Sequence, residues 1–214
     1  MTKGAGRGRY DRSRTTGERA VETREKLLDA ATEVFAARGY TGTRVEDLVD
    51  HAAVSRRTLY EHFDSIDAIL EEVYERAVRI SFSTVLQKLM GVTDPIERVD
   101  VGIRAYYEII RDNAAAARVV FEVYRTAGDA QAAKYELNTT RYASLMFEFL
   151  SMAFAAGRLE RAPDETSVYA LIKGLDAVAI RSLQRKEHAS LPDIAPQMSR
   201  LIKSAFGARA AEPG

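Results

Sequence analysis

Six polar side chains suited to binding nucleic acid fall within eight residues of this 214-residue chain. They are Ser55, Arg56, Arg57, Thr58, Tyr60 and His62. Arginine forms bidentate hydrogen bonds to guanine, Ser and Thr hydroxyls bind bases or phosphates, and Tyr and His suit backbone phosphates. Leu59 and Phe63 supply the apolar anchors of the same segment, so the polar residues line the outer face of a short helix. The pattern favours a helix that reads DNA; the alternative is an ordinary solvated helix face.

A helix this short has to be held in place by neighbours, because two or three apolar anchors do not stabilise it alone. Apolar residues recur at spacings of three and four after Glu22, which predicts a first helix that ends at a glycine C-cap, Arg38-Gly39. The inward residues of that helix are Leu27, Leu28, Ala31, Val34 and Phe35.

A second helix is predicted after residues 41–43, with Thr43 as its N-cap and Glu46 completing a capping box. Its inward residues are Val45, Leu48, Val49 and Ala52. Ala53-Val54 forms the turn that follows, and Ser55 caps the third helix. Helix, tight turn and short helix in about twenty-five residues is the layout of a helix-turn-helix DNA reader.

Composition limits which other kinds of protein the chain can be. Apolar residues make up 46% of it, enough for a buried core, and Lys plus Arg equals Asp plus Glu at 31 each. With no net charge, the case for DNA rests on local charge. The absence of cysteine excludes a disulfide framework, a thiol nucleophile and Cys-containing metal sites. Neither a secretion signal nor a membrane-spanning stretch is recognisable, so a soluble, cytoplasmic protein with no membrane partner is expected.

Residues 1–19 are predicted to form a disordered basic tail, with six positive side chains against two negative ones. The alternative is an arm that lies on phosphates or in a minor groove. Beyond the reader, helix-type periodicity continues over 66–90, 95–112, 114–127, 130–156, 167–186 and the segment after 193, and no segment has a strand's period of two. The fold is therefore predicted to be all-α. The second half of 130–156 is apolar on nearly every face, which predicts a central helix.

The sequence GYTGTRVEDL at 39–48, followed by VSRRTLYEHFDS at 54–65, resembles the DNA-binding domain of tetracycline-repressor-type (TetR-type) transcription regulators. The resemblance covers roughly residues 20–80. It implies a three-helix DNA-binding domain over 20–80, joined through a fourth helix to an all-helical effector-binding and dimerisation domain over 81–214. Ala53 stands where the family often has glycine, and a left-handed backbone there would cost on the order of 1 kcal/mol.

The resemblance also assigns roles to the reader's polar residues. It implies phosphate contacts from Thr43, Tyr60 and His62, and groove contacts from Ser55, Arg56, Arg57 and Thr58. Arg44, inside the matching segment, is included among the DNA-binding residues. The implied partner is a double-stranded DNA operator, and the implied function is repression of transcription.

The last two helices each carry an apolar stripe, which includes Leu171, Val178, Met198, Leu201 and Ile202. One interpretation is that both stripes pack inward. The other, favoured by the resemblance, is a homodimer in which both helices pair with their copies in a four-helix bundle. Two-fold symmetry would then present two recognition helices to the two halves of a palindromic operator.

The middle helices contain aromatic and methionine side chains, together with an aspartate in an apolar run. Most such residues are simply core, but buried hydroxyl and carboxyl groups need partners, and a ligand cavity would satisfy both requirements. We therefore predict a small apolar or aromatic effector whose binding moves the two readers out of register. The candidate ligand-binding residues are Tyr106, Phe121, Tyr124, Tyr142, Met146, Phe149, Tyr169 and Asp176.

Two other functions, an enzyme and a helical interaction protein, are alternatives to a DNA-binding regulator. The three histidines are far apart in sequence, and no zinc-protease, nucleophile-elbow or phosphate-loop motif occurs, so no catalytic residue, metal site or cofactor is predicted. A helical interaction or small-molecule-binding protein with an incidental helix-turn-helix is the remaining alternative. Steep salt dependence of operator binding would separate a DNA regulator from both.

Overall fold

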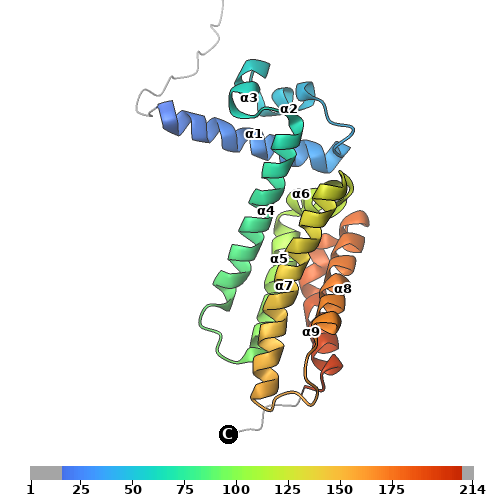
Figure 1. Ribbon diagram of the computed structural model, residues 1–214. Helices are drawn as coiled ribbons and strands as arrows, with labels where there is room; N and C mark the ends of the chain where they lie inside the picture. Colours follow the sequence, from blue (N-terminus) through green and yellow to red (C-terminus); the bar gives the residue numbers. More distant parts are fainter. Residues whose placement is uncertain (1–15, 209–214) are drawn as a thin grey trace, which may run out of the picture.

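A computed structural model describes residues 16–208, which form an all-helical molecule (Figure 1). The α-helices of this range are α1 Thr16–Arg38, α2 Val45–Ala52, α3 Arg56–His62, α4 Ile66–Leu89, α5 Pro95–Asp112, α6 Ala114–Arg118, α7 Asp129–Ala155, α8 Glu165–Gln184 and α9 Leu191–Ala205. Between 16 and 208 the only β-type pairing is one isolated bridge, Leu159 to Ala208. The all-α prediction is confirmed.

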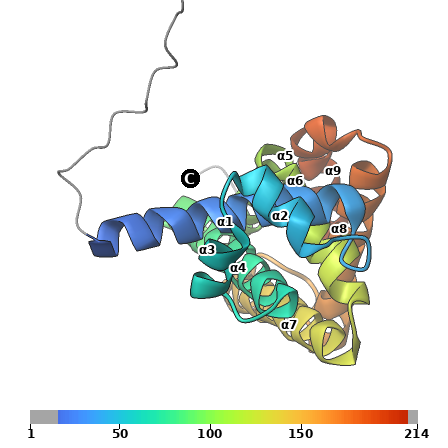
Figure 2. The ribbon, with the colours of Figure 1, turned by 90° about the horizontal axis from the view of Figure 1, so that it is seen from above.

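Helix α4 connects two hydrophobic cores. Helices α1, α2 and α3 lie together at one end of the molecule, and α4 runs from them along the bundle formed by α5, α7, α8 and α9 (Figures 1 and 2). Val78 of α4 belongs to the core of the three-helix end, and Val85 belongs to the core of the bundle. A displacement of α4 would therefore change the packing of both cores.

Side-chain caps fix where the helices begin, largely as predicted. The Asp94 carboxylate accepts a hydrogen bond from the Ile96 amide at 2.8 Å and precedes Pro95, which needs no amide partner at a helix start. Ser65 caps α4 in the same way, accepting from the Ala68 amide at 3.1 Å. Gly39 ends α1 with φ of 72°, the left-handed conformation expected of a glycine C-cap.

The N-terminal boundary of the first helix differs from the prediction. Helix α1 begins at Thr16, so residues 16–19 are helical and are not part of a disordered tail. Glu18 lies in the first turn of α1, where its negative charge is favourable beside the helix dipole. The rest of the predicted basic tail, residues 1–15, lies outside the described residues.

The single helix predicted over 114–127 is divided into three parts. After α6, Val119–Val123 has the wider π-helical hydrogen bonding, and Tyr124–Thr126 forms one 3₁₀ turn. This stretch serves both cores: Val119, Val123 and Tyr124 pack with the three-helix end, whereas Phe121 packs in the bundle. The apolar pattern is compatible with each of these helix types and therefore did not reveal the change.

The prediction of a central position for the apolar half of α7 is wrong. Met152 and Phe154 are 44% and 42% exposed near its C-terminal end. Helix α7 packs against α5 and α8, so its remaining face is left uncovered in the monomer. The helix ends just beyond, where Gly157 adopts a φ of 71°.

Tyr124 joins the helical segment after α6 to α4. Its ring stacks on Tyr74 with centroids 3.6 Å apart and an interplanar angle of 9°. Its hydroxyl donates to Glu71 Oε2 at 2.7 Å, and that carboxylate also pairs with Lys134 of α7. Three elements therefore meet at Glu71, and burial raises the pKa of Tyr124 to about 12, which keeps its phenol protonated.

We expect Tyr124→Phe to lower the free energy of unfolding by about 1–2 kcal/mol, because it leaves a partly buried carboxylate without one charge-assisted hydrogen bond. Urea denaturation would measure the change. Tyr60→Phe is the matched control, since Tyr60 is 53% exposed, and it should alter stability by less than about 0.5 kcal/mol. Equal stabilities for the two variants would contradict the role of the Glu71 contact.

Candidate functional site

In the turn between α2 and α3, Ala53, which stands where the TetR-type family often has glycine, adopts a left-handed backbone. Its φ and ψ are 50° and 49°, and its amide donates to the Asp50 carbonyl at 3.2 Å. Val54 then donates to the Val49 carbonyl at 3.0 Å, which closes the turn tightly enough to set α3 across α2. An alanine methyl is disfavoured in this conformation, so the turn is strained.

Ala53→Gly is therefore expected to stabilise the protein by about 0.5–1 kcal/mol, the relief of left-handed strain less the greater entropy of glycine in the unfolded chain. Thermal or chemical denaturation would show it. Ala37→Gly, at an exposed position inside α1, is the opposing control and should destabilise by about 1 kcal/mol. A loss of stability in Ala53→Gly would show that the turn is not strained.

Helix α3 is held as predicted. Ser55 Oγ accepts a hydrogen bond from the Thr58 amide at 3.0 Å and lies 2.9 Å from the Thr58 hydroxyl. Leu59 and Phe63 are 0% and 4% exposed in the core of the three-helix end. The opposite face of α3 is thereby turned to solvent.

The exposed face of α3 carries Arg56, Arg57 and Tyr60, as predicted. The Arg57 side chain is 88% exposed and reaches only Glu61, one turn along the helix, at 2.9 Å. The Arg56 side chain is 62% exposed and pairs with Glu46 of α2. Both arginines are thus presented on exposed, solvent-screened ion pairs, which cost little to break.

The N-cap position of α2 is occupied by Arg44, and not by Thr43 as the sequence predicted. Thr43 is 7% exposed and its hydroxyl donates to the Gly39 carbonyl at 2.7 Å, so it does not cap α2. Arg44 is the N-cap residue, and its amide donates to Asp47 Oδ2 at 2.9 Å. The predicted cap with Glu46 is therefore wrong, and a phosphate contact from the Thr43 hydroxyl would compete with its bond to Gly39.

Arg24 of α1 is a positioning residue that sequence reasoning missed. Its guanidinium pairs with Glu72 of α4, donates to the His62 carbonyl at 2.7 Å, and lies 4.2 Å from the Phe63 ring centroid. It therefore ties α1 to α4 and to the last residue of α3. Contacts across 38 and 48 residues leave no local signal in the sequence. His62 itself is only partly exposed.

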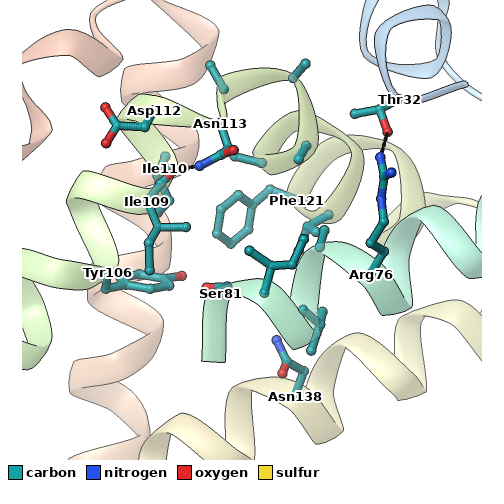
Figure 3. A pocket seen from close by; sticks show the side chains of 18 of the residues that line it. Thr32, Arg76, Ser81, Tyr106, Ile109, Ile110, Asp112, Asn113, Phe121 and Asn138 are labelled. Atoms are coloured by element: carbon teal, nitrogen blue, oxygen red, sulfur yellow. Dashed lines mark hydrogen bonds between the residues drawn. The ribbon is translucent and has the colours of Figure 1, made fainter. Parts of the chain in front are cut away.

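A cavity of about 700 Å³ lies between α4, α5, α7 and α8 and extends to α1 and α2 (Figure 3). Its size and mostly apolar lining are typical of small-molecule sites. Six of the eight predicted ligand-binding residues line it: Tyr106, Phe121, Tyr142, Met146, Phe149 and Asp176.

The other two predicted ligand residues are not among the residues lining this cavity. Tyr124 faces Tyr74 and Glu71, in the contact described above. The Tyr169 hydroxyl donates to Glu136 Oε2 at 2.5 Å on the outer side of α7 and α8. Helix periodicity shows that a residue is inward, but which of two interior surfaces it meets depends on how the helices pack.

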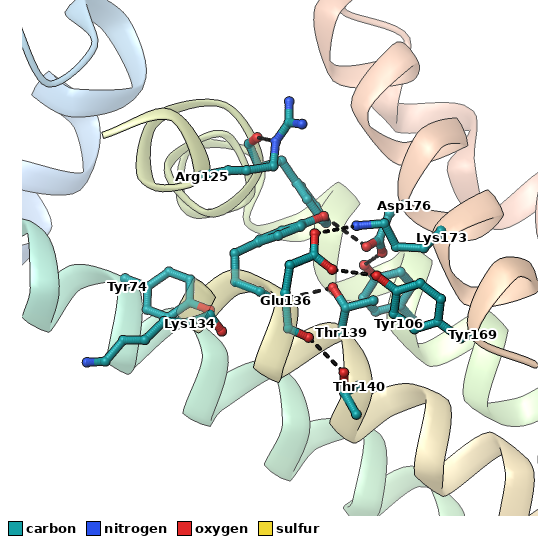
Figure 4. A network of polar contacts seen from close by, with 12 residues as sticks. Tyr74, Tyr106, Arg125, Lys134, Glu136, Thr139, Thr140, Tyr169, Lys173 and Asp176 are labelled. Carbon is teal, nitrogen blue, oxygen red and sulfur yellow. Dashed lines mark hydrogen bonds and ion pairs between the residues drawn. The ribbon is translucent and has the colours of Figure 1, made fainter. Parts of the chain in front are cut away.

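Asp176, which lines the cavity, is the centre of a network of polar contacts (Figure 4). It is 5% exposed and accepts hydrogen bonds from the Tyr106 hydroxyl at 2.6 Å and the Tyr135 hydroxyl at 2.9 Å. Burial raises the pKa of Asp176, and the two phenol donors oppose that shift. The positive charge of Lys173 also lowers the pKa of Asp176, but Lys173 itself pairs with Glu136 at 2.9 Å. The predicted need of Asp176 for partners is thus met by tyrosines, one of which, Tyr135, sequence reasoning missed.

Further polar side chains that were not predicted line the cavity. Ser81 shares a hydrogen bond of 2.8 Å with the Tyr142 hydroxyl, and burial raises the pKa of Tyr142 to about 12. Asn138 has a buried amide oxygen without a partner. Arg76 of α4 reaches Glu25 and Asp29 of α1, each at 2.8 Å. Single polar residues within amphipathic helices carry no pattern that would have singled them out.

Among residues 16–208, no group of three or more His, Cys, Asp or Glu side chains is placed to hold a metal ion. Within the same range, no helix is both long and apolar enough to span a bilayer.

The three-helix reader and the cavity-bearing bundle together define a class of two-part helical proteins with an N-terminal helix-turn-helix. Residues 27–73 match the family described as bacterial regulatory proteins, tetR family. This segment of the chain therefore carries the DNA-binding domain of the TetR-type regulators.

Two curated relatives and one solved structure illustrate the similarity. The HTH-type transcriptional activator FasR of Mycolicibacterium smegmatis is 32% identical over 130 residues, which cover 61% of this chain and 59% of FasR. The HTH-type transcriptional repressor KstR2 of the same species is 26% identical over 167 residues, 78% of this chain and 82% of KstR2. The chain thus spans less than two thirds of the length of FasR.

The solved structure is that of the transcriptional regulator FadR from Bacillus subtilis in complex with stearoyl-CoA. It superposes with a TM-score of 0.74 over 85% of this chain and 98% of that one. At 18% identity the likeness establishes the fold alone. The two proteins therefore share the arrangement of a helix-turn-helix domain on a helical bundle. The ligand that one of them binds does not follow for the other from this likeness.

Proposed function

We propose that this chain is a sequence-specific DNA-binding repressor of transcription that binds a palindromic operator as a homodimer and is released by a small apolar or aromatic effector. Residues 20–80 form the DNA-binding domain, and residues 81–214 bind the effector and form the dimer. A regulator of this kind acts in the cytoplasm, where bacterial DNA lies. FasR and KstR2, to which the chain is similar, are named as transcriptional regulators.

One observation carries the proposal: a single cavity is lined both by the bundle and by the elements that hold the reader. Tyr106 and Phe149 of the bundle share it with Arg76 of α4 and with Glu25 and Asp29 of α1. An occupant of this cavity touches the helices whose mutual position sets the direction of α3. Binding and DNA release can therefore be linked, to the extent that the effector prefers one arrangement of α1 and α4 over the other.

The proposed DNA contacts are adjusted by the geometry of the reader. Arg56, Arg57, Ser55 and Thr58 remain the candidates for base contacts in the major groove, since all four lie at the start or on the outer side of α3. Exposed Tyr60 and Arg44 are the candidates for phosphate contacts, with His62 beside them. Thr43 is a weaker candidate because its hydroxyl is engaged with Gly39.

The dimer is proposed from the last two helices. Most of their apolar residues pack inward, among them Ile172, Leu183 and Ile202. Leu171 and Val178 are only partly buried, and Leu201 is 55% exposed, so a narrower apolar face remains for a second copy. Sedimentation at micromolar concentration tests the proposal: a dimer is expected, and a monomer at that concentration would contradict it.

Selection of bound sequences from a random DNA pool tests the proposal as a whole. A regulator of this kind should enrich one inverted repeat, with half-sites about 34 Å or a multiple of that apart, and its affinity should fall steeply with added salt. An interaction protein, or an enzyme with an incidental helix-turn-helix, would enrich nothing. Adding a ligand that raises the melting temperature should then lower affinity for the selected sequence.

A further inference from the structure

The side chains that line the cavity carry more negative than positive charge. Five carboxylates line it, together with the basic side chains Lys26, His51 and Arg76. The carboxylates are Glu25, Asp29, Glu33, Asp112 and Asp176. Arg76 pairs with Glu25 and Asp29, and Arg111 pairs with Asp112, so Glu33 and Asp176 are the negative charges that these two arginines do not offset, against the one positive charge of Lys26. An anionic ligand would meet a repulsive potential here, and a cation would be attracted.

Asp176 and Asn138, which both line the cavity, offer it hydrogen-bond acceptors. The phenol protons of Tyr106 and Tyr135 are donated to Asp176, so the oxygens of both phenols and of the carboxylate keep unused acceptor capacity. The buried Oδ1 of Asn138 has no donor either. Lys173, whose charge acts on Asp176, pairs with Glu136 and is not among the residues lining the cavity.

Buried acceptors are costly without donors, and a ligand that supplies a donor would remove that cost. We infer that the cavity is selective for an apolar molecule that bears a hydrogen-bond-donating head group, a protonated amine above all, and no negative charge. The head group pairs with Asp176, and the apolar body lies along Phe121, Met146 and Phe149. This inference rests on the proposed effector-binding role of the cavity and names the chemical class of its ligand. It also sets the site apart from one suited to an acyl-CoA, which is polyanionic.

The test compares ligands that differ only in the head group. Isothermal titration calorimetry on the full-length protein, without DNA, would use dodecylamine, dodecanol and dodecanoate at submicellar concentrations, with stearoyl-CoA as a fourth probe. The amine is expected to bind at least about tenfold more tightly than the carboxylate, with the alcohol between them. The reason is that the Asp176 carboxylate attracts an ammonium group and repels a second carboxylate. Equal or tighter binding of dodecanoate or stearoyl-CoA would overturn the inference.

Asp176→Asn assigns the preference to one side chain. The amide keeps an oxygen that can accept from Tyr106 and Tyr135 but has no charge, so the advantage of the amine over the alcohol should disappear. Asp193→Asn, at an exposed position in the first turn of α9, is the matched control and should keep the order of affinities found for the native protein. An amine preference that survives in Asp176→Asn would overturn the role given to Asp176. If that variant fails to fold, the order of affinities in the native protein still decides the ligand class.

The outcomes separate this inference from the proposed function. If the amine binds with the expected preference but leaves DNA affinity unchanged, the cavity chemistry stands and effector control falls. If an anionic ligand binds best and releases DNA, the regulator stands and the inferred ligand class falls.

Discussion

Replacing Arg57 by alanine is expected to lower operator affinity by about ten- to hundredfold and to flatten the preference among bases at the position that Arg57 reads. Its side chain is 88% exposed on the outer face of α3, and a bidentate contact to a guanine is worth about 1–3 kcal/mol of discrimination. In a dimer the contact is lost in both half-sites. Fluorescence anisotropy with the selected operator and a scrambled duplex, at one fixed salt concentration, would measure both effects.

Stability should not change in this variant, because the ion pair of Arg57 with Glu61 is solvent-exposed and worth at most about 0.5 kcal/mol. The matched control is Arg79→Ala, which removes the same charge from an exposed position of α4, away from the reader. It should bind the operator within about twofold of the native protein, given how little single exposed charges contribute at moderate salt. If both variants bind alike, α3 does not read bases through Arg57.

The capping residues explain why some helix boundaries could be predicted and others could not. Ser55 before Arg56 was located by residue type and spacing, because its other hydrogen-bond partner, the Thr58 hydroxyl, belongs to the same helix turn that it caps. Thr43 had the right type and spacing as well, but its hydroxyl is captured by the Gly39 carbonyl of the preceding helix end. The Thr43 hydroxyl can either cap α2 or donate to the Gly39 carbonyl, and which of these hydrogen bonds forms depends on the angle at which the chain leaves α1.

The candidate sites divide in the same way. The recognition face of α3 follows from one helix and its periodicity, and the resemblance to the family marked Ala53 as the residue on which a left-handed turn would be costly. The cavity requires the rotation of each helix about its axis, so Tyr106 and Tyr142 were placed correctly, whereas Tyr124 and Tyr169 were not. Arg24 and Arg76 contact side chains about 40 to 50 residues away in the sequence, and a single sequence contains no pattern that identifies such distant pairs.

Those two arginines supply a physical route between the cavity and the reader. Arg76 of α4 is one of the residues lining the cavity, and its guanidinium forms ion pairs with Glu25 and Asp29 of α1 at 2.8 Å each. Directly before Glu25 on α1, Arg24 pairs with Glu72 of α4 and donates to the carbonyl of His62, the last residue of α3. A ligand that shifts α4 against α1 therefore strains contacts that fix where α3 points. The Arg76 side chain is 16% exposed, so its ion pairs are better shielded than those of Arg57.

Arg76→Met is expected to uncouple the two sites while leaving each of them working. Methionine keeps the apolar stem of arginine, and the freed Glu25 and Asp29 side chains are 56% and 73% exposed, so solvation replaces the lost pairing. Operator affinity without ligand should stay within about threefold, and calorimetry should still detect the ligand. The ligand-induced loss of operator affinity, about 5- to 150-fold for typical coupling energies, should fall to a few-fold or less. Arg79→Met, exposed on the same helix, should keep the full response. An undiminished response in Arg76→Met would mean that coupling passes instead through Tyr74 and Tyr124, the other contact at which the bundle meets the core of the reader.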